Sequence, residues 1–120
     1  MATRSLILKH DDNSDTFTGI YCHWDGYPAG VGVRLNGNYK DPAKISALFE
    51  LGDLSMLGPE LKDTIAFCRD QGELMSRKFV FGTIDAIKTY LDDSDIEYAH
   101  VFQGGSWTSY DRNGGVHKYL

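Results

Sequence analysis

The sequence predicts an α+β fold, in which an antiparallel sheet built from N-terminal and C-terminal hairpins carries two to three helices on one face. Near the start of the chain, two β-rich stretches enclose a polar turn at residues 11–15. Near its end, a second pair encloses Gly104-Gly105, a dipeptide typical of two-residue hairpin turns. Apolar residues at helical spacing lie between the hairpins. Strands and helices grouped in this way are typical of α+β proteins.

The N-terminal hairpin is predicted from residues 3–10 and 16–24, which are rich in β-branched and aliphatic residues around the turn segment DDNSD. Successive side chains of a strand point to opposite faces. One face of the second stretch therefore carries Ile20, Cys22 and Trp24, and the other carries Tyr21, His23 and Asp25. Because Leu6 and Leu8 mark an apolar face, we expect the first set to face the core. Cys22 is then a small buried side chain, the usual state of a free cysteine.

Three helices are predicted between the hairpins. The first covers about residues 28–39, where a proline suits the first turn and three glycines weaken the helix. The second begins with Asp41 as N-cap and Pro42 in the first position. The third begins at Thr83 or Gly82 and continues to about residue 91, with apolar side chains along one face.

The remaining segments complete the predicted fold. Strands are expected at residues 64–69, 96–103, 106–110 and 116–119, and a loop at residues 70–76. Residues 78–81 are either a short strand or the lead-in to the third helix. The length of 120 residues suits a single domain over residues 1–120. The two hairpins leave edge strands, which would allow a homodimer.

Composition excludes several functions. The net charge of −5 and the scattered basic residues give no basic face for nucleic acid phosphates, so no direct nucleic-acid binding is expected. No apolar run approaches the length of a membrane span, and the N-terminus does not resemble a signal peptide. Two cysteines are too few for a disulfide framework, although a single disulfide would be allowed if they lay close together. These features predict a cytoplasmic protein with reduced thiols.

The stretch IYCHWDGYP, residues 20–28, is the first candidate site. His23 and Asp25 share a face two residues apart, so they could hold one edge of a metal or orient the imidazole. The alternative is that Asp25 caps the helix beginning near Pro28 while His23 makes one structural hydrogen bond. Because no ligand spacing typical of zinc sites is present, we expect no metal and no cofactor. Beside Tyr27, this helix start is the best place for an anion.

The stretch CRDQGE, residues 68–73, is the second candidate. Arg69 can hold a phosphate or carboxylate with its planar fork, and Asp70 and Glu73 lie nearby in the sequence. The alternative is an internal pair between the arginine and a carboxylate. Tyr and Trp residues add surfaces for a planar ligand or a protein partner, with core packing as the alternative. The predicted binding residues are His23, Asp25, Tyr27, Arg34, Arg69, Asp70 and Glu73.

Residues 21–32, YCHWDGYPAGVG, resemble the YCHWDGYP-x-GVG motif of a family of small uncharacterised phage and prophage proteins. The resemblance extends to TRS at residues 3–5, to the arginine–aspartate–x–glycine–glutamate stretch at 69–73, and to EYAHVF and SWTSY near the C-terminus. The chain departs from the family at Ala29, where relatives carry an acidic residue, and near Val33, where they carry a second basic one. The resemblance implies a small phage accessory protein that acts against host defence, and it implies no catalytic residue.

These observations favour a non-enzymatic binding protein that inhibits a host defence system. It would bind a defence protein complex, in the manner of an anti-CRISPR protein, or sequester a small anionic nucleotide signal. The alternative is a small hydrolase or nucleotide-processing enzyme that uses His23 with Asp25, Asp70 or Glu73. A third hypothesis is an interaction module with an exposed aromatic and acidic face.

Overall fold

The structure is a computed structural model that describes residues 2–74 and 76–119. Its strands are β1 (Ser5–Asp11), β2 (Thr16–Cys22), β3 (Leu54–Met56), β4 (Ile65–Ala66), β5 (Phe79–Phe81), β6 (Tyr98–Gln103), β7 (Ser106–Asp111) and β8 (Val116–Lys118). Its helices are α1 (Val33–Asn38), α2 (Pro42–Glu50), α3 (Phe67–Gln71) and α4 (Ile84–Asp92), with a π-helical turn η1 (Pro28–Gly32) and a 3₁₀ turn η2 (Leu61–Asp63). This mixture of helices and strands confirms the α+β class.

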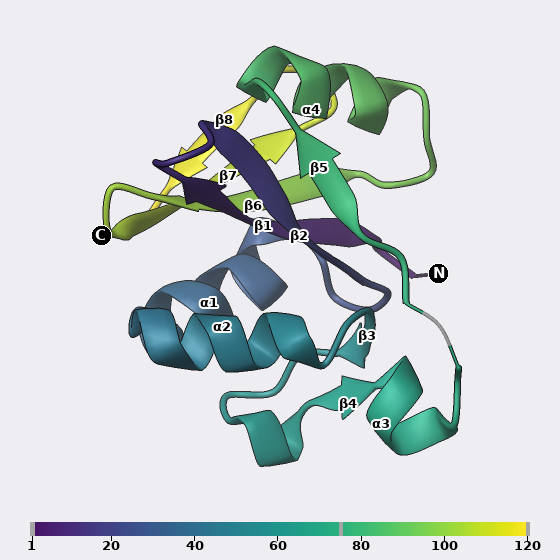
Figure 1. Cartoon of the computed structure of the whole chain (residues 1–120). Helices are drawn as coiled ribbons and strands as arrows, with labels where there is room; N and C mark the ends of the chain where they lie inside the picture. The colour runs from purple at the N-terminus through teal and green to yellow at the C-terminus, as the bar shows by residue number, and fades with distance from the viewer. Residues whose placement is uncertain (1, 75, 120) are drawn as a thin grey trace.

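One mixed sheet connects all the strands (Figure 1). Its order is β4-β3-β2-β1-β6-β7-β8, and β5 also pairs with β2. The two predicted hairpins, β1–β2 and β6–β7, are antiparallel as expected. However, β1 and β6 join them in parallel, and β2 pairs with β3 in parallel. The expectation of a purely antiparallel sheet is therefore wrong at these two junctions, where long intervening segments return the chain in the same direction.

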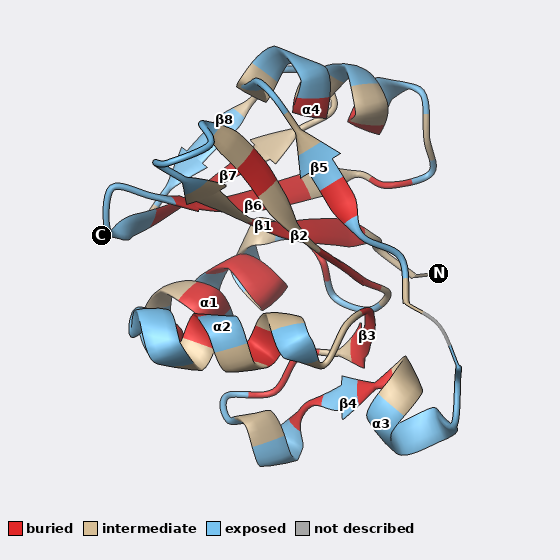
Figure 2. Ribbon diagram, viewed as in Figure 1, coloured by how far each residue is buried: buried red, intermediate tan, exposed pale blue. Residues whose placement is uncertain are grey.

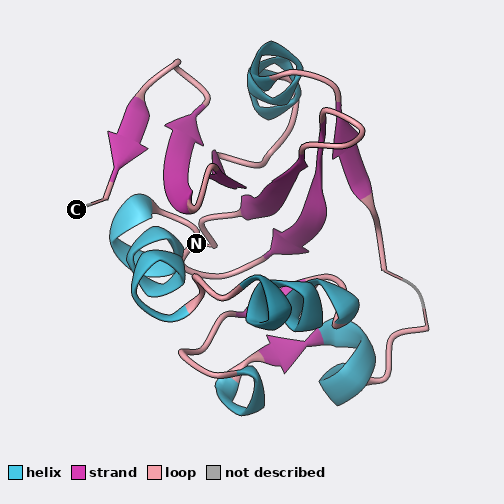
Figure 3. Cartoon of the chain, turned by 60° about the vertical axis from the view of Figure 1, so that its left-hand side comes forward, coloured by secondary structure: helices cyan, strands magenta, loops and turns pink. Residues whose placement is uncertain are grey.

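Helices cover both faces of the sheet, so the expectation that they share one face is wrong (Figures 1 and 3). On one face, Ile7 belongs to an apolar cluster that includes residues of α1 and α2. On the other face, Leu6 and Leu8 pack with Ile87 and Leu91 of α4. Figure 2 shows buried residues on the central strands and on the helix surfaces turned toward them. A strand covered on both sides buries consecutive residues rather than alternate ones.

The side chains of β2 alternate between the two faces as expected, but both faces are buried. Ile20 and Cys22 lie in the cluster with α1 and α2, whereas Tyr21 lies in the cluster of Leu6 and Leu8. The expectation that Ile20 and Cys22 share the face of the two leucines, and that Tyr21 lies on an outer face, is therefore wrong. Cys22 is buried and free as predicted, and burial raises the pKa of its thiol to about 12. Trp24 lies beyond the strand and is 44% exposed, so its predicted place in the core is wrong.

The predicted helix starts are confirmed by their capping contacts. The Asp41 carboxylate accepts a hydrogen bond from the Ala43 amide at 2.9 Å, and the Thr83 hydroxyl accepts one from the Ala86 amide at 3.0 Å. The predicted helix at residues 28–39 is present as η1 followed by α1. Along the described ranges, every helix is too short or too polar to cross a lipid bilayer.

The segment after Thr64 differs from its prediction. The expected strand at residues 64–69 is limited to β4, and the chain then forms α3 in place of part of the expected loop. The Asp70 carboxylate accepts a hydrogen bond from the Ala66 amide at 2.8 Å, which stabilises the start of the helix. Gly72 ends it with a left-handed φ of 74°.

Candidate functional site

The candidate site lies where β2 changes its pairing partner. One end of β2 pairs with β5, from Phe17 to Gly19, and the other end pairs with β3 at Cys22. Between these two pairings, the carboxylate of Asp53 accepts the hydrogen bond that the backbone of a neighbouring strand would otherwise accept. Its Oδ1 accepts the Tyr21 amide at 3.0 Å, and its Oδ2 accepts the Arg77 amide at 3.2 Å. This buried side chain therefore connects the segment before β5 to the C-terminal part of β2.

Arg77 is the most distinctive residue of the site. Its guanidinium carbon lies 4.6 Å from the centre of the Tyr21 ring and 5.3 Å from that of Phe79. Its Nε lies 3.4 Å from Asp53 Oδ2. The side chain is still 57% exposed, and within residues 2–74 and 76–119 no group accepts a hydrogen bond from its terminal nitrogens. Two rings and one carboxylate thus hold the guanidinium while its outer edge stays accessible.

Two cavities flank Tyr21 and Arg77. The first, of about 540 Å³, is lined by Tyr21, Asp53, Phe67, Glu73, Ser76 and Arg77. The second, of about 440 Å³, is lined by Arg4, Tyr21, Arg77, Tyr90, Asp93, Ser94, Asp95 and Ile96. Both volumes lie in the range of small-molecule sites. Because Tyr21 and Arg77 line both cavities, a ligand in either cavity could contact these two residues.

The Tyr21 hydroxyl connects the site to His23. Its oxygen lies 2.7 Å from His23 Nδ1. Burial raises the pKa of Tyr21, and the nearby positive charge of Arg4 acts in the opposite direction. The hydroxyl is therefore protonated at neutral pH and can donate to the imidazole. The His23 ring also meets Trp24 edge-on, with 4.9 Å between centroids, and lies 6.5 Å from Phe67.

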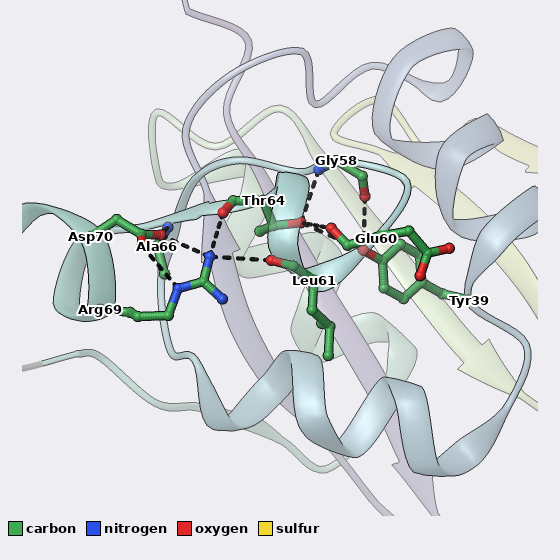
Figure 4. Close-up of polar contacts among 8 residues, drawn as sticks. All are labelled: Tyr39, Gly58, Glu60, Leu61, Thr64, Ala66, Arg69 and Asp70. Carbon is green, nitrogen blue, oxygen red and sulfur yellow. Dashed lines mark hydrogen bonds and ion pairs between the residues drawn. The ribbon is translucent and has the colours of Figure 1, made fainter.

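Arg69 and Asp70 form the internal pair that was one alternative for this stretch (Figure 4). Arg69 Nε donates to Asp70 Oδ1 at 2.9 Å, and Nη2 donates to the Leu61 carbonyl at 3.1 Å and also to the Thr64 carbonyl. The Arg69 side chain, followed by the Ala66 amide, lowers the pKa of Asp70. These contacts bind α3 to η2 and β4, so the arginine has a structural role.

The other predicted residues lie in separate places. Tyr27 donates to Asp25 Oδ1 at 3.3 Å, and Arg34 Nη1 donates to the Leu57 carbonyl at 2.7 Å. Asp25 contacts η1 through its backbone carbonyl, which accepts the Val31 amide at 2.9 Å, rather than through a capping carboxylate. Glu73 lines the first cavity. Among the described residues, no hydrogen bond or ion pair joins all seven predicted residues into one pocket, and their binding role stays a prediction.

Sequence reasoning missed Arg4, Asp53 and Arg77 as site residues. The alternation of β2 did place Tyr21 beside His23, and this was the one local signal that pointed here. Among the described residues, no group of three His, Cys, Asp or Glu side chains is placed to hold a metal ion. Comparisons with protein-family models, curated proteins and solved structures gave no match.

Proposed function

We propose that the chain is a binding protein, and that the anionic group of its ligand is held by Arg77 and Arg4 beside Tyr21. The observation that supports this proposal is the combination of contacts and exposure of the Arg77 side chain. Its Nε donates to Asp53 and its guanidinium carbon lies over the Tyr21 and Phe79 rings, yet the side chain is 57% exposed and lines both cavities. The terminal nitrogens carry the paired donors that match a carboxylate or phosphate.

Preorganisation supports this role for Arg77. A free arginine loses considerable side-chain freedom when it binds an anion. Here the contacts with Tyr21 and Asp53 already restrict the side chain before any ligand arrives. Arg4 lines the second cavity and supplies a further positive charge. An oxyanion bound by the Arg77 fork would receive charge-assisted hydrogen bonds at a smaller entropic cost.

The resemblance to small phage proteins supplies the proposed setting. In it, the protein would counter host defence by sequestering a small anionic signal. A second mode, direct binding to a defence protein, is favoured by Trp24 and Tyr27, which are 44% and 40% exposed on the segment after β2. Exposed Trp and Tyr side chains are common anchors in protein interfaces.

The test is an NMR titration of the full ¹⁵N-labelled chain with inorganic pyrophosphate at low salt. We expect amide shifts around Tyr21, Ser94 and Arg77, and at least a tenfold weaker affinity in Arg77→Ala, equivalent to about 1.4 kcal/mol. Arg77→Lys keeps the charge but loses the fork and should also bind more weakly. Lys40→Ala removes an exposed positive charge that lines none of the cavities at Arg77, and this variant should bind normally.

Two results would overturn the proposal. One is equal binding by the wild type and Arg77→Ala when both are folded, as judged by dispersed amide spectra. The other is a pattern in which pyrophosphate shifts the amide signals of lysines outside the two cavities rather than those around Arg77. Native mass spectrometry of protein purified from host cells adds a direct search for a retained ligand, and a retained anion should be lost in Arg77→Ala.

A further inference from the structure

The first cavity holds both signs of charge. Arg77 contributes the positive charge, while Asp53 and Glu73 contribute two carboxylates. Asp53 is occupied, because it accepts two backbone amides and the Arg77 side chain. Glu73 is exposed, and within the described part of the chain no basic group forms an ion pair with it. One oriented cation and one uncommitted carboxylate therefore face the same space.

Two aromatic side chains also line the first cavity. Tyr21 and Phe67 both line the cavity, and Phe67 begins α3. The Glu73 amide donates to the Phe67 carbonyl at 3.0 Å, which ties the position of the glutamate to that of the ring. An aromatic or other apolar group could cover the two rings and gain from their removal from water.

We propose that the ligand of this cavity is a zwitterionic aromatic compound, and this inference rests on the proposed function of Arg77. Its oxyanion meets the Arg77 fork, its ring lies against Tyr21 and Phe67, and its ammonium group meets Glu73. A ligand with an anion alone would leave Glu73 as a like-charge neighbour, which opposes binding. A ligand with an amine alone would meet Arg77 in the same unfavourable way.

Three matched probes test this assignment with the full chain. L-phenylalanine carries the ring, the ammonium and the carboxylate. 3-Phenylpropionate lacks the ammonium, and phenethylamine lacks the carboxylate. We expect the wild type to bind phenylalanine about tenfold more tightly than either of the other two, as measured by amide shifts in NMR titrations. That factor corresponds to about 1.4 kcal/mol for the missing charged contact.

Variants assign each contact. Glu73→Gln should remove the preference for phenylalanine over 3-phenylpropionate, since it removes the carboxylate that favours the ammonium. Glu60→Gln is the matched control, because the Glu60 side chain is 56% exposed and lines none of the cavities at Arg77. Arg77→Ala should weaken phenylalanine and 3-phenylpropionate alike.

The outcomes separate this inference from the function on which it rests. Equal binding of phenylalanine and 3-phenylpropionate by the wild type would overturn the zwitterion assignment, as would a preference that persists in Glu73→Gln. If neither phenylalanine nor 3-phenylpropionate binds while pyrophosphate still binds in an Arg77-dependent way, this inference alone is overturned. If no anion shows dependence on Arg77, the proposed function fails as well.

Discussion

At the scale of single residues, Asp53 supplies hydrogen-bond acceptors to backbone amides that have no strand beside them. It is 7% exposed, and its two carboxylate oxygens accept amides from segments 32 and 24 residues away. Its own amide donates to Ser76 Oγ at 2.6 Å. A short acidic side chain can thus satisfy two buried donors where no neighbouring backbone is present.

Replacing Asp53 with alanine should lower the free energy of unfolding by about 2–3 kcal/mol, because two amides lose a charged acceptor. Urea denaturation followed by circular dichroism measures this change. Asp92→Asn, at an exposed position of α4, should change stability by less than about 0.5 kcal/mol. If Asp53→Ala unfolds at the same urea concentration as the wild type, then water or a backbone shift satisfies the two amides in place of the carboxylate.

At the scale of elements, α4 is the clearest example of a helix whose start is determined by a neighbouring residue in the sequence. The Thr83 hydroxyl caps it, and its Ile87 and Leu91 cover the face of the sheet that carries Leu6 and Leu8. The cap satisfies an amide at the start of the helix that has no intrahelical acceptor. The helix that it starts is part of the core.

Thr83→Ala should therefore destabilise the protein by about 1 kcal/mol. Thr89→Ala is the matched control, because Thr89 is exposed in the same helix and alanine is a better helix former. Paired urea denaturation curves of the two variants make the measurement. Equal stabilities would show that the Thr83 hydroxyl does not contribute a cap in solution.

The hairpins and helix caps could be predicted from sequence because neighbouring residues determine them. The turn at Gly104-Gly105 and the N-caps Asp41 and Thr83 are local features, and all were predicted. The parallel pairing of β1 with β6 joins segments about 90 residues apart, and no local pattern encodes it. The packing of α1 and α2 on one face and of α4 on the other is also a long-range feature, so it could not be predicted either.

The candidate site follows the same rule. His23 and Glu73 were predicted and lie at or beside the first cavity, through the Tyr21 hydroxyl and as a lining residue respectively. Arg77 was missed because its importance depends on Tyr21 and Asp53, which are distant in sequence. Arg69 was favoured because its sequence neighbours were charged, but those neighbours include its internal partner, Asp70.

At the scale of the whole molecule, a buried polar chain joins the centre of the sheet to the C-terminal segment. His100 on β6 is fully buried, and its Nε2 lies 2.7 Å from the Gly26 carbonyl. Its Nδ1 lies 2.5 Å from Ser109 Oγ, which is in turn 2.6 Å from the Tyr119 hydroxyl. Because a carbonyl only accepts, the neutral ring donates from Nε2, Ser109 donates to Nδ1, and Tyr119 donates to Ser109.

Burial lowers the pKa of His100 to about 4, and this sets an acid limit on stability. The unfolded chain binds a proton at this residue near pH 6.5, whereas the folded chain does not until about pH 4. Between these values His100 should reduce the free energy of unfolding by about 1.4 kcal/mol per pH unit as the pH falls. The total approaches about 3 kcal/mol, and His100 contributes no slope above about pH 7.

Urea denaturation of the wild type and of His100→Gln between pH 4 and 8 isolates this effect. The variant should be less stable at pH 7, but its stability should fall less steeply between pH 6.5 and 4, by about one proton. Asp15 raises the pKa of His10, so the stabilisation from His10 is lost only as the pH rises through that raised value. The lowered pKa values of Asp11 and Asp70 act below about pH 4. Parallel profiles for the wild type and variant would mean that His100 titrates normally in the folded protein and that the buried chain opens readily to water.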